Sequence, residues 1–302
     1  MAEDRNTHVV VVGASGFVGR HLLAGLRRSG YDTLGTQCSS HRDDLRNFDL
    51  RTDRILDILP DAFLRPARAY VAICGGIANV AACSRDPAGS RQVNVTNTMR
   101  LIDDLAVHGY RPIYFSTSAV FDGTRSRYDE STPPSPLHEY GKQKAAMEDY
   151  VLSQVPGGIV VRLSKVLSAD CRERHLLSEW LERVRENRPL ECISAESFSP
   201  TAAADIAAAI LRLMEGGHSG LFHVAAMEGY RRDDLARLFL GIVGSDLPII
   251  RRGPEYFGFA EPRPLCSVLD SSKLITATGS RFTPVRQLIE DFWDAAKRGL
   301  LV

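Results

Sequence analysis

The chain has 302 residues, of which 44% are hydrophobic and 25% are charged, as is typical of a globular protein with its own core. Its 37 Lys and Arg residues balance 37 Asp and Glu residues, so we expect neither nucleic acid nor an anionic membrane as a partner. The apolar runs are too short to span a bilayer, and Met1–Asp4 lack the basic start of a signal peptide. We therefore expect a cytoplasmic protein.

The six cysteines and eight histidines are scattered along the chain. No Cys-x-x-Cys pair and no His-x-x-x-His pattern occurs, so metal-ligand spacing is absent. We expect reduced thiols and no metal site.

The first half of the chain alternates short apolar runs with amphipathic stretches, the pattern of βαβ units. Apolar spacing predicts helices at 18–29, 91–108 and 140–154. Strands are predicted at 8–12, 33–36, 70–73, 113–116 and 159–161. Right-handed crossovers between these strands predict an α/β fold with a doubly wound parallel sheet.

The pattern changes after Val161. A charged amphipathic stretch at 172–188 and a strand-and-loop stretch at 189–200 predict a smaller lobe, which a Pro- and Gly-rich segment at 246–278 also joins. A helical stretch at 201–215 and a strand at 220–225 return to the sheet. We predict a first lobe at 1–164, completed by about 201–240, and a smaller C-terminal lobe formed by 165–200 and 241–302.

A glycine-rich loop, GASGFVG at 13–19, follows the first predicted strand and opens the first predicted helix. A dinucleotide site needs one glycine for a tight turn, one for close approach of the pyrophosphate and one for packing of the helix on the strand. The amides at the start of the helix then face the phosphates. The loop therefore predicts a dinucleotide-binding first lobe, with contacts from Gly13, Ser15, Gly16, Phe17 and Val18.

The end of the second predicted strand bears on the identity of the dinucleotide. NAD-binding folds usually place a carboxylate there to hold the ribose 2′-hydroxyl. This strand ends instead in Gln37, Ser39, Ser40 and Arg42, whose hydroxyls and guanidinium could accept a 2′-phosphate. We predict NADP as the cofactor, with NAD as the alternative.

Tyr140 and Lys144 stand one helical turn apart, so both side chains lie on one face. A nearby ammonium stabilises a phenolate and lowers its pKa, which makes tyrosine a usable general acid for a carbonyl that receives a hydride. Such a pair also occurs by chance on exposed helices. A second signal is the strand that ends in Ser116, Thr117 and Ser118, because ligands gather at the carboxyl ends of parallel strands.

Together these motifs resemble the extended short-chain dehydrogenases, and within them the dTDP-4-dehydrorhamnose reductase type. The resemblance covers nearly the whole chain. Besides 13–19 and YGKQK at 140–144, it includes STSAVFDG at 116–123 and the short motifs at 94–95, 162–164, 200–201 with Asp205, 263–264, 267–270 and 273–274.

The resemblance implies that Thr117, Tyr140 and Lys144 are catalytic, and that Lys144 also holds the nicotinamide ribose. It implies further cofactor contacts from Asp49, Leu50, Cys74, Gly75, Gly76, Asn94, Ser116 and Leu163. The expected substrate contacts are Thr117, Ser118, Lys165 and Arg263. A guanidinium suits a diphosphate, so Arg263 is the first candidate for that group and Arg162 the second.

The resemblance implies an NAD(P)H-dependent reductase of a keto group on a nucleotide-activated deoxysugar, with the smaller lobe as the substrate-binding lobe. We expect a homodimer. Two alternatives stay open: a sugar-nucleotide epimerase that retains its cofactor, and a non-catalytic regulatory subunit that binds cofactor and a partner enzyme. The sugar also stays open, because Ser118, Ala119 and Lys165 stand where this type often has Asp, Tyr and an aromatic residue.

Overall fold

Strand β1 (Thr7–Val12) is buried on both faces, because its consecutive valines point to alternate sides of the sheet. Val9 and Val11 pack into one hydrophobic cluster, and Val10 and Val12 pack into a second cluster on the other side. This is the period of two that a strand imposes, and burial of both faces is typical of a parallel sheet. The computed structural model describes residues 7–40 and 42–300; the signal-peptide expectation concerns Met1–Asp4, which lie outside them.

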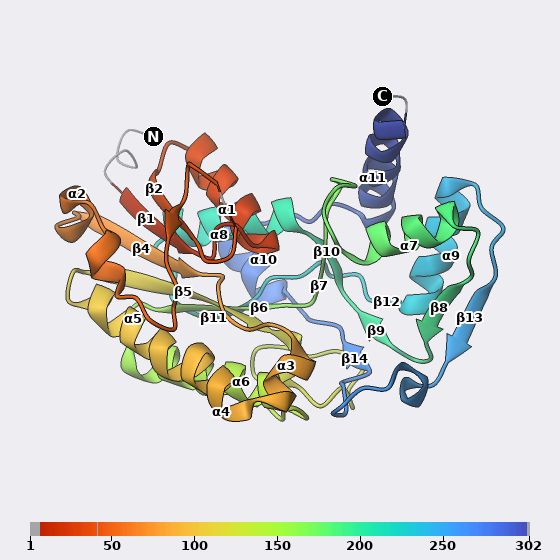
Figure 1. The fold of residues 1–302 in the computed structure, drawn as a ribbon, viewed down its shortest axis with the longest axis horizontal. Helices are drawn as coiled ribbons and strands as arrows, with labels where there is room; N and C mark the ends of the chain where they lie inside the picture. Colours follow the sequence, from red (N-terminus) through yellow and green to blue (C-terminus); the bar gives the residue numbers. More distant parts are fainter. Residues whose placement is uncertain (1–6, 41, 301–302) are drawn as a thin grey trace.

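A parallel sheet of seven strands forms the first lobe (Figure 1). In spatial order the strands are β11 (Gly220–His223), β6 (Ile159–Leu163), β5 (Tyr110–Thr117), β4 (Arg68–Ile73), β1, β2 (Asp32–Gln37) and β3 (Arg46–Asn47). The chain order reverses between β1 and β4, and ligands bind at such a switch point in doubly wound sheets. The predicted α/β fold with a doubly wound sheet is confirmed.

Helices cover both faces of the sheet. On one face lie α1 (Phe17–Arg28), α8 (Ala203–Glu215) and α10 (Ser272–Thr278), and on the other lie α5 (Thr98–Ala106) and α6 (Glu139–Gln154) (Figure 1). Short helices α2 (Asp61–Leu64), α3 (Val80–Arg85) and α4 (Pro87–Arg91) lie between the strands. The single helix predicted at 91–108 is interrupted, because a π-helical segment, Gln92–Asn97, joins α4 to α5.

The smaller lobe has its own core of aromatic and aliphatic side chains, with Trp180, Phe239 and Phe292 among them. Its helices are α7 (Leu176–Arg185), α9 (Arg232–Val243) and α11 (Val285–Leu300). Its short strands are β7 (Lys165–Leu167), β8 (Leu190–Ile193), β9 (Ser197–Phe198), β10 (Pro200–Ala202), β12 (Tyr230–Arg231), β13 (Ile249–Arg252) and β14 (Cys266–Ser267). Among the described helices, none has the length and apolar character needed to cross a bilayer.

Two helices, α9 and α10, pack against a different lobe from the one that the sequence predicts for them. Leu235 and Phe239 of α9 lie in the core of the smaller lobe, although residues up to about 240 were expected to complete the first lobe. Leu274 of α10 instead packs against the central sheet. Apolar spacing indicates which face of a helix is buried but not against which lobe. We therefore propose that α9 belongs to the smaller lobe and α10 to the first lobe.

A buried ion pair ties α6 to the sheet. Glu148 and Arg162 are 3% and 2% exposed, and Arg162 Nε and Nη2 donate to the two carboxylate oxygens at 2.9 and 2.6 Å. The Ser116 hydroxyl donates to the same carboxylate. The structure therefore places Arg162 in the core, where its guanidinium is committed to Glu148 and cannot serve as the second candidate for a diphosphate.

We expect Glu148→Ala to lower the free energy of unfolding by about 3–5 kcal/mol, because it leaves the Arg162 charge buried without a partner. Urea denaturation measures this change. The matched control is Glu182→Ala on α7, where the side chain is exposed and the change should stay within about 0.5 kcal/mol. Equal stability of the two variants would contradict the role given to the buried pair.

Candidate functional site

The glycine-rich loop forms a tight turn at the switch point of the sheet. Gly13 has a positive φ of 78°, and its N–H donates to Thr36 Oγ1 at 3.1 Å. The Gly16 N–H donates back to the Gly13 carbonyl at 3.0 Å, and α1 begins one residue later. Gly16 has no side chain to cap the first turn of α1, so the first amides of the helix are open to an anion.

The three glycines of the loop answer to different constraints. A Cβ atom at Gly13 would lie 2.6 Å from the Gly75 backbone, and one at Gly19 would lie 2.3 Å from the Gly13 carbonyl oxygen. The fold itself therefore requires these two glycines. At Gly16 the φ is an ordinary −72°, and the nearest atom to an added Cβ would be the Gly13 oxygen at 3.2 Å. Gly16 is the position that leaves space in front of the helix, which fits the approach of a pyrophosphate.

Two adjoining cavities run along the carboxyl ends of the strands, and they share Gly75, Gly76 and Ile77. The first, of about 210 Å³, is also lined by Val12, Gly13, Thr36, Gln37, Cys38, Phe48, Asp49, Leu50, Arg51 and Val93. The second, of about 150 Å³, is also lined by Val18, Cys74, Ala78, Asn94, Phe115, Ser116, Tyr140, Lys144 and Leu163. We call the two together the trough.

The trough brings together most of the residues predicted to contact the cofactor. Six of the predicted residues do not line it: Ser15, Gly16, Phe17, Ser39, Ser40 and Arg42. Sequence reasoning missed its apolar lining at Phe48, Ile77 and Val93, and it also missed Arg51. Phe48, Arg51 and Ile77 lie in loops and Val93 lies in the π-helical segment, where no local pattern marks a ligand contact.

The smaller lobe holds the start of α1 in place. The Phe17 ring stacks on the His175 ring, with centroids 5.6 Å apart and planes at 14°. Glu173 accepts hydrogen bonds from Arg20 at 3.3 Å and from His21 at 2.8 Å. These contacts join the first turns of α1 to the segment that leads into α7, so Phe17 acts between the lobes as well as beside the glycine loop.

Tyr140 and Lys144 enter the trough from the first turns of α6. The Lys144 ammonium donates to the Phe115 carbonyl at 2.7 Å and lies 5.8 Å from the centre of the Tyr140 ring. A Cβ at Gly141 would lie 2.4 Å from the Ala119 carbonyl oxygen, so α6 packs directly against the turn that follows β5. This close approach places the phenol beside the hydroxyl-bearing end of that strand.

Burial controls the charge states of this pair. It raises the pKa of Tyr140 to about 12 and lowers the pKa of Lys144 to about 8. Burial therefore raises the tyrosine pKa, which the ammonium was expected to lower, and the sequence could not reveal this burial. The phenol is protonated at neutral pH, as a proton donor must be, and the lysine is still mostly cationic.

The hydroxyls after β5 have separate partners. Thr117 Oγ1 accepts a hydrogen bond from the Ala119 N–H at 3.1 Å and can still donate its own hydrogen. Ser118 is buried, and neither Thr117 nor Ser118 lines the trough. Of these three hydroxyl-bearing residues, Ser116 alone lines it.

A pair of buried amides fixes α6 against the floor of the trough. Asn94, in the π-helical segment, accepts from the Ile77 N–H at 2.7 Å and donates to the Ile77 carbonyl at 3.0 Å. It also donates to Gln143 Oε1 at 2.8 Å. Gln143, which sequence reasoning missed, is fully buried and donates onward to Ser90 Oγ at 2.8 Å. In the sequence, only its polar side chain and its position between Tyr140 and Lys144 could have indicated a role for Gln143.

The predicted substrate residues Lys165 and Arg263 surround a carboxylate outside the trough. Burial lowers the pKa of Lys165, with Glu196 opposing the shift and Arg232 adding to it. Arg232 and Glu196 act on Arg263 as well. Arg232 Nη1 donates to Glu196 Oε2 at 2.6 Å, while its buried Nε has no partner among the described residues. Three cations thus lie around Glu196, while Glu179 also acts on Lys165, and Arg232 was not predicted.

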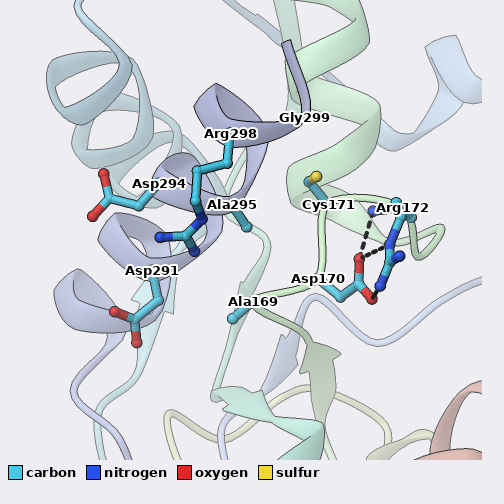
Figure 2. Close-up of a pocket in the computed structure, with 9 residues that line it drawn as sticks. All are labelled: Ala169, Asp170, Cys171, Arg172, Asp291, Asp294, Ala295, Arg298 and Gly299. Atoms are coloured by element: carbon cyan, nitrogen blue, oxygen red, sulfur yellow. Dashed lines mark hydrogen bonds and ion pairs between the residues drawn. The ribbon is translucent and has the colours of Figure 1, made fainter. Parts of the chain in front are cut away.

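A wider hollow of about 670 Å³ lies in the smaller lobe between the loop at 169–172 and α11 (Figure 2). Asp170 is committed to Arg172, with bonds of 2.9 and 2.6 Å, and Asp291, Asp294 and Arg298 extend from α11. None of the predicted site residues lines this hollow, so the trough remains the candidate functional site.

Substitution of Gly16 tests the phosphate role of the loop. We expect Gly16→Val to weaken NADPH binding at least about tenfold, because the branched side chain fills the space in front of α1. Loss of the glycine at this helix start should cost about 1 kcal/mol, so the variant should fold. Fluorescence titration measures the affinity, and Gly241→Ala, where an added Cβ meets no atom within 4 Å, is the control. Unchanged affinity in folded Gly16→Val would contradict the assignment.

Comparisons with known proteins agree with this geometry. A family model described as RmlD substrate binding domain matches residues 7–298. The dTDP-4-keto-6-deoxy-D-glucose reductase of Streptomyces niveus is 28% identical over 263 residues, which cover 86% of this chain and 87% of that protein. Methionine adenosyltransferase 2 subunit beta of Mus musculus is 26% identical over 297 residues, which cover 94% of this chain and 87% of that protein.

The fold also matches solved structures over almost its full length. The structure of dTDP-4-dehydrorhamnose reductase from Bacillus anthracis in complex with NADP has a TM-score of 0.81 with this chain, at 20% sequence identity. The match covers 95% of this chain and 98% of that one. The family match spans nearly all of the described residues, and so the chain belongs to the RmlD substrate binding domain family, within the extended short-chain dehydrogenases.

Proposed function

We propose that the protein reduces a keto group on a nucleotide-activated deoxysugar, with hydride from NADPH and a proton from Tyr140. The observation that carries this proposal is the trough, in which the glycine loop opens beside one cavity and Tyr140 and Lys144 line the other. A dinucleotide with its pyrophosphate at α1 has one end in each cavity.

The chain is an NAD(P)-dependent oxidoreductase, in keeping with its family and with its reductase relatives. When bound, the nicotinamide cofactor supplies the hydride. Tyr140 is protonated at neutral pH and donates its proton to the oxygen that gains negative charge. Lys144 lies near the ring and favours the phenolate that this donation leaves. Thr117 retains a hydroxyl hydrogen that can hold the substrate oxygen.

A nucleotide diphosphate is the substrate class that best fits the charges around Lys165 and Arg263. Lys165, Arg232 and Arg263 outnumber Glu196 and Glu179, the two carboxylates that act on Lys165, which leaves an excess of positive charge for phosphate oxygens. Guanidinium groups bind such oxygens through paired hydrogen bonds. The homodimer and the cytoplasmic location stay predictions, and the six free thiols of the structure fit a reducing compartment.

A regulatory subunit is the second candidate, because a methionine adenosyltransferase subunit matches 94% of this chain. The two functions differ in one observable. A reductase oxidises NADPH when it is offered nucleotide-linked 4-keto sugars, whereas a cofactor-binding subunit does not. An epimerase that retains its cofactor also shows no net oxidation of NADPH but converts the sugar.

Tyr140→Phe tests the proposed proton donor most directly. It keeps the ring and its packing but removes the proton donor, so turnover should fall about 10²- to 10⁴-fold while NADPH affinity changes little. Turnover is measured as the rate of NADPH oxidation with a panel of nucleotide-linked 4-keto sugars. The matched control is Tyr150→Phe on the same helix, where the hydroxyl donates to Asp103 outside the trough. Turnover of Tyr140→Phe within a few fold of the parent would overturn the mechanism.

The low pKa of Lys144 predicts a pH profile. Its folded-state pKa of about 8 means that the ammonium is present below pH 8 and is lost as the pH rises through that value. We expect kcat/KM to fall about tenfold per pH unit above that point, since this ratio reports ionisation of the free enzyme. A plateau that extends beyond pH 10 would indicate that Tyr140, and not Lys144, sets the alkaline limit.

A further inference from the structure

The first cavity of the trough has the lining of an adenosine site. Phe48, Leu50, Ile77 and Val93 give it apolar walls that suit a flat base. It lies at the carboxyl end of β2, where Gln37 and Cys38 contribute to the lining. In this fold the end of the second strand meets the ribose that bears the 2′-hydroxyl or 2′-phosphate. The charges at this position therefore decide which nicotinamide cofactor binds.

Among the residues predicted to take a 2′-phosphate, Arg42, Ser39 and Ser40 do not line this cavity, and Gln37 lines it but is bound to other groups. Arg42 Nε and Nη2 donate to the two oxygens of Asp44, each at 3.0 Å, and Arg27 donates to the same carboxylate at 2.7 Å. Gln37 is buried and turned towards its own loop, where it donates to Asn47 Oδ1 at 3.1 Å and to the Arg42 carbonyl at 3.0 Å. Ser39 and Ser40 do not line the cavity.

Arg51 is the one cationic side chain among the described residues that line this cavity. It is 66% exposed, so its guanidinium lies at the mouth of the cavity and not in its floor. Asp49 holds it there, with bonds to Nε at 3.0 Å and to Nη2 at 2.7 Å. The Cys38 side chain, directly after β2, interacts with both Asp49 and Arg51. The guanidinium is thus positioned at the end of β2.

We propose that Arg51 is the residue that selects NADPH over NADH, by binding the 2′-phosphate at the end of β2. Arginine carries five N–H donors, so the groups that Asp49 does not use remain for phosphate oxygens. Asp49 orients the guanidinium and adds no net repulsion, because its charge is balanced by Arg51. This inference rests on the cofactor part of the proposed function and is independent of which sugar is reduced.

The test compares Arg51→Gln with Arg42→Gln, which remove the same charge from two arginines that both follow β2 and are each paired with an aspartate. Titrations of nicotinamide fluorescence give the affinities of each protein for NADPH and NADH. Arg51→Gln should lose about ten- to a hundredfold in NADPH affinity, the usual effect of a charge-assisted contact, and keep its NADH affinity. Arg42→Gln should leave both affinities unchanged. The thermal midpoint should change little in either variant, because both ion pairs are exposed.

Competition by 2′,5′-ADP and 5′-AMP tests the contact between Arg51 and the 2′-phosphate without the nicotinamide end of the cofactor. These two ligands differ in the 2′-phosphate. The parent should bind 2′,5′-ADP more tightly, and Arg51→Gln should bind the two alike. Loss of NADPH preference in Arg42→Gln alone, or an equal loss of NADPH and NADH affinity in Arg51→Gln, would overturn the assignment. Either result would leave the reductase proposal standing, since that proposal fails only through the Tyr140 and substrate tests.

Discussion

The close approach of two backbone turns at the switch point is the constraint on which the site depends. Gly13, after β1, and Gly75, after β4, come so near each other that a Cβ at Gly13 would lie 2.6 Å from Gly75. Because both turns are bare of side chains, a continuous trough passes over them from the end of β2 to the start of α6.

The catalytic end of the trough depends on how firmly α6 is placed. Gly141 sets the separation from the turn after β5, and the buried Glu148–Arg162 pair ties the middle of the helix to β6. Gln143 joins the helix to Asn94, whose side-chain amide is also hydrogen-bonded to the backbone of Ile77. Tyr140 and Lys144 are therefore held on a rigid element, as a proton donor must be if its distance to a substrate is to stay constant.

Sequence reasoning succeeded where local spacing carries the structural requirement. The glycine loop, the Tyr140–Lys144 pair and the order of strands and helices are all local patterns, and the structure brings the residues they mark to one trough. Sequence reasoning failed where packing between distant segments determines the position of a side chain or a helix. Arg42 lies in the loop after β2 and pairs with Asp44 without lining the cavity, while Arg51 lines the cavity from beyond β3. The lobe that α9 joins and the burial that raises the tyrosine pKa have no local signal either.

The central claim is that a dinucleotide lies along the whole trough, with its adenine end near Phe48 and its nicotinamide end near Tyr140. A crystal structure of the protein with NADPH tests this claim most directly. The account predicts the adenine between Phe48 and Val93, the pyrophosphate at the amides of α1, and the nicotinamide within contact distance of Tyr140 and Leu163. A nicotinamide that lies outside the cavity of Tyr140 and Lys144, or a dinucleotide bound in the opposite direction, would contradict it.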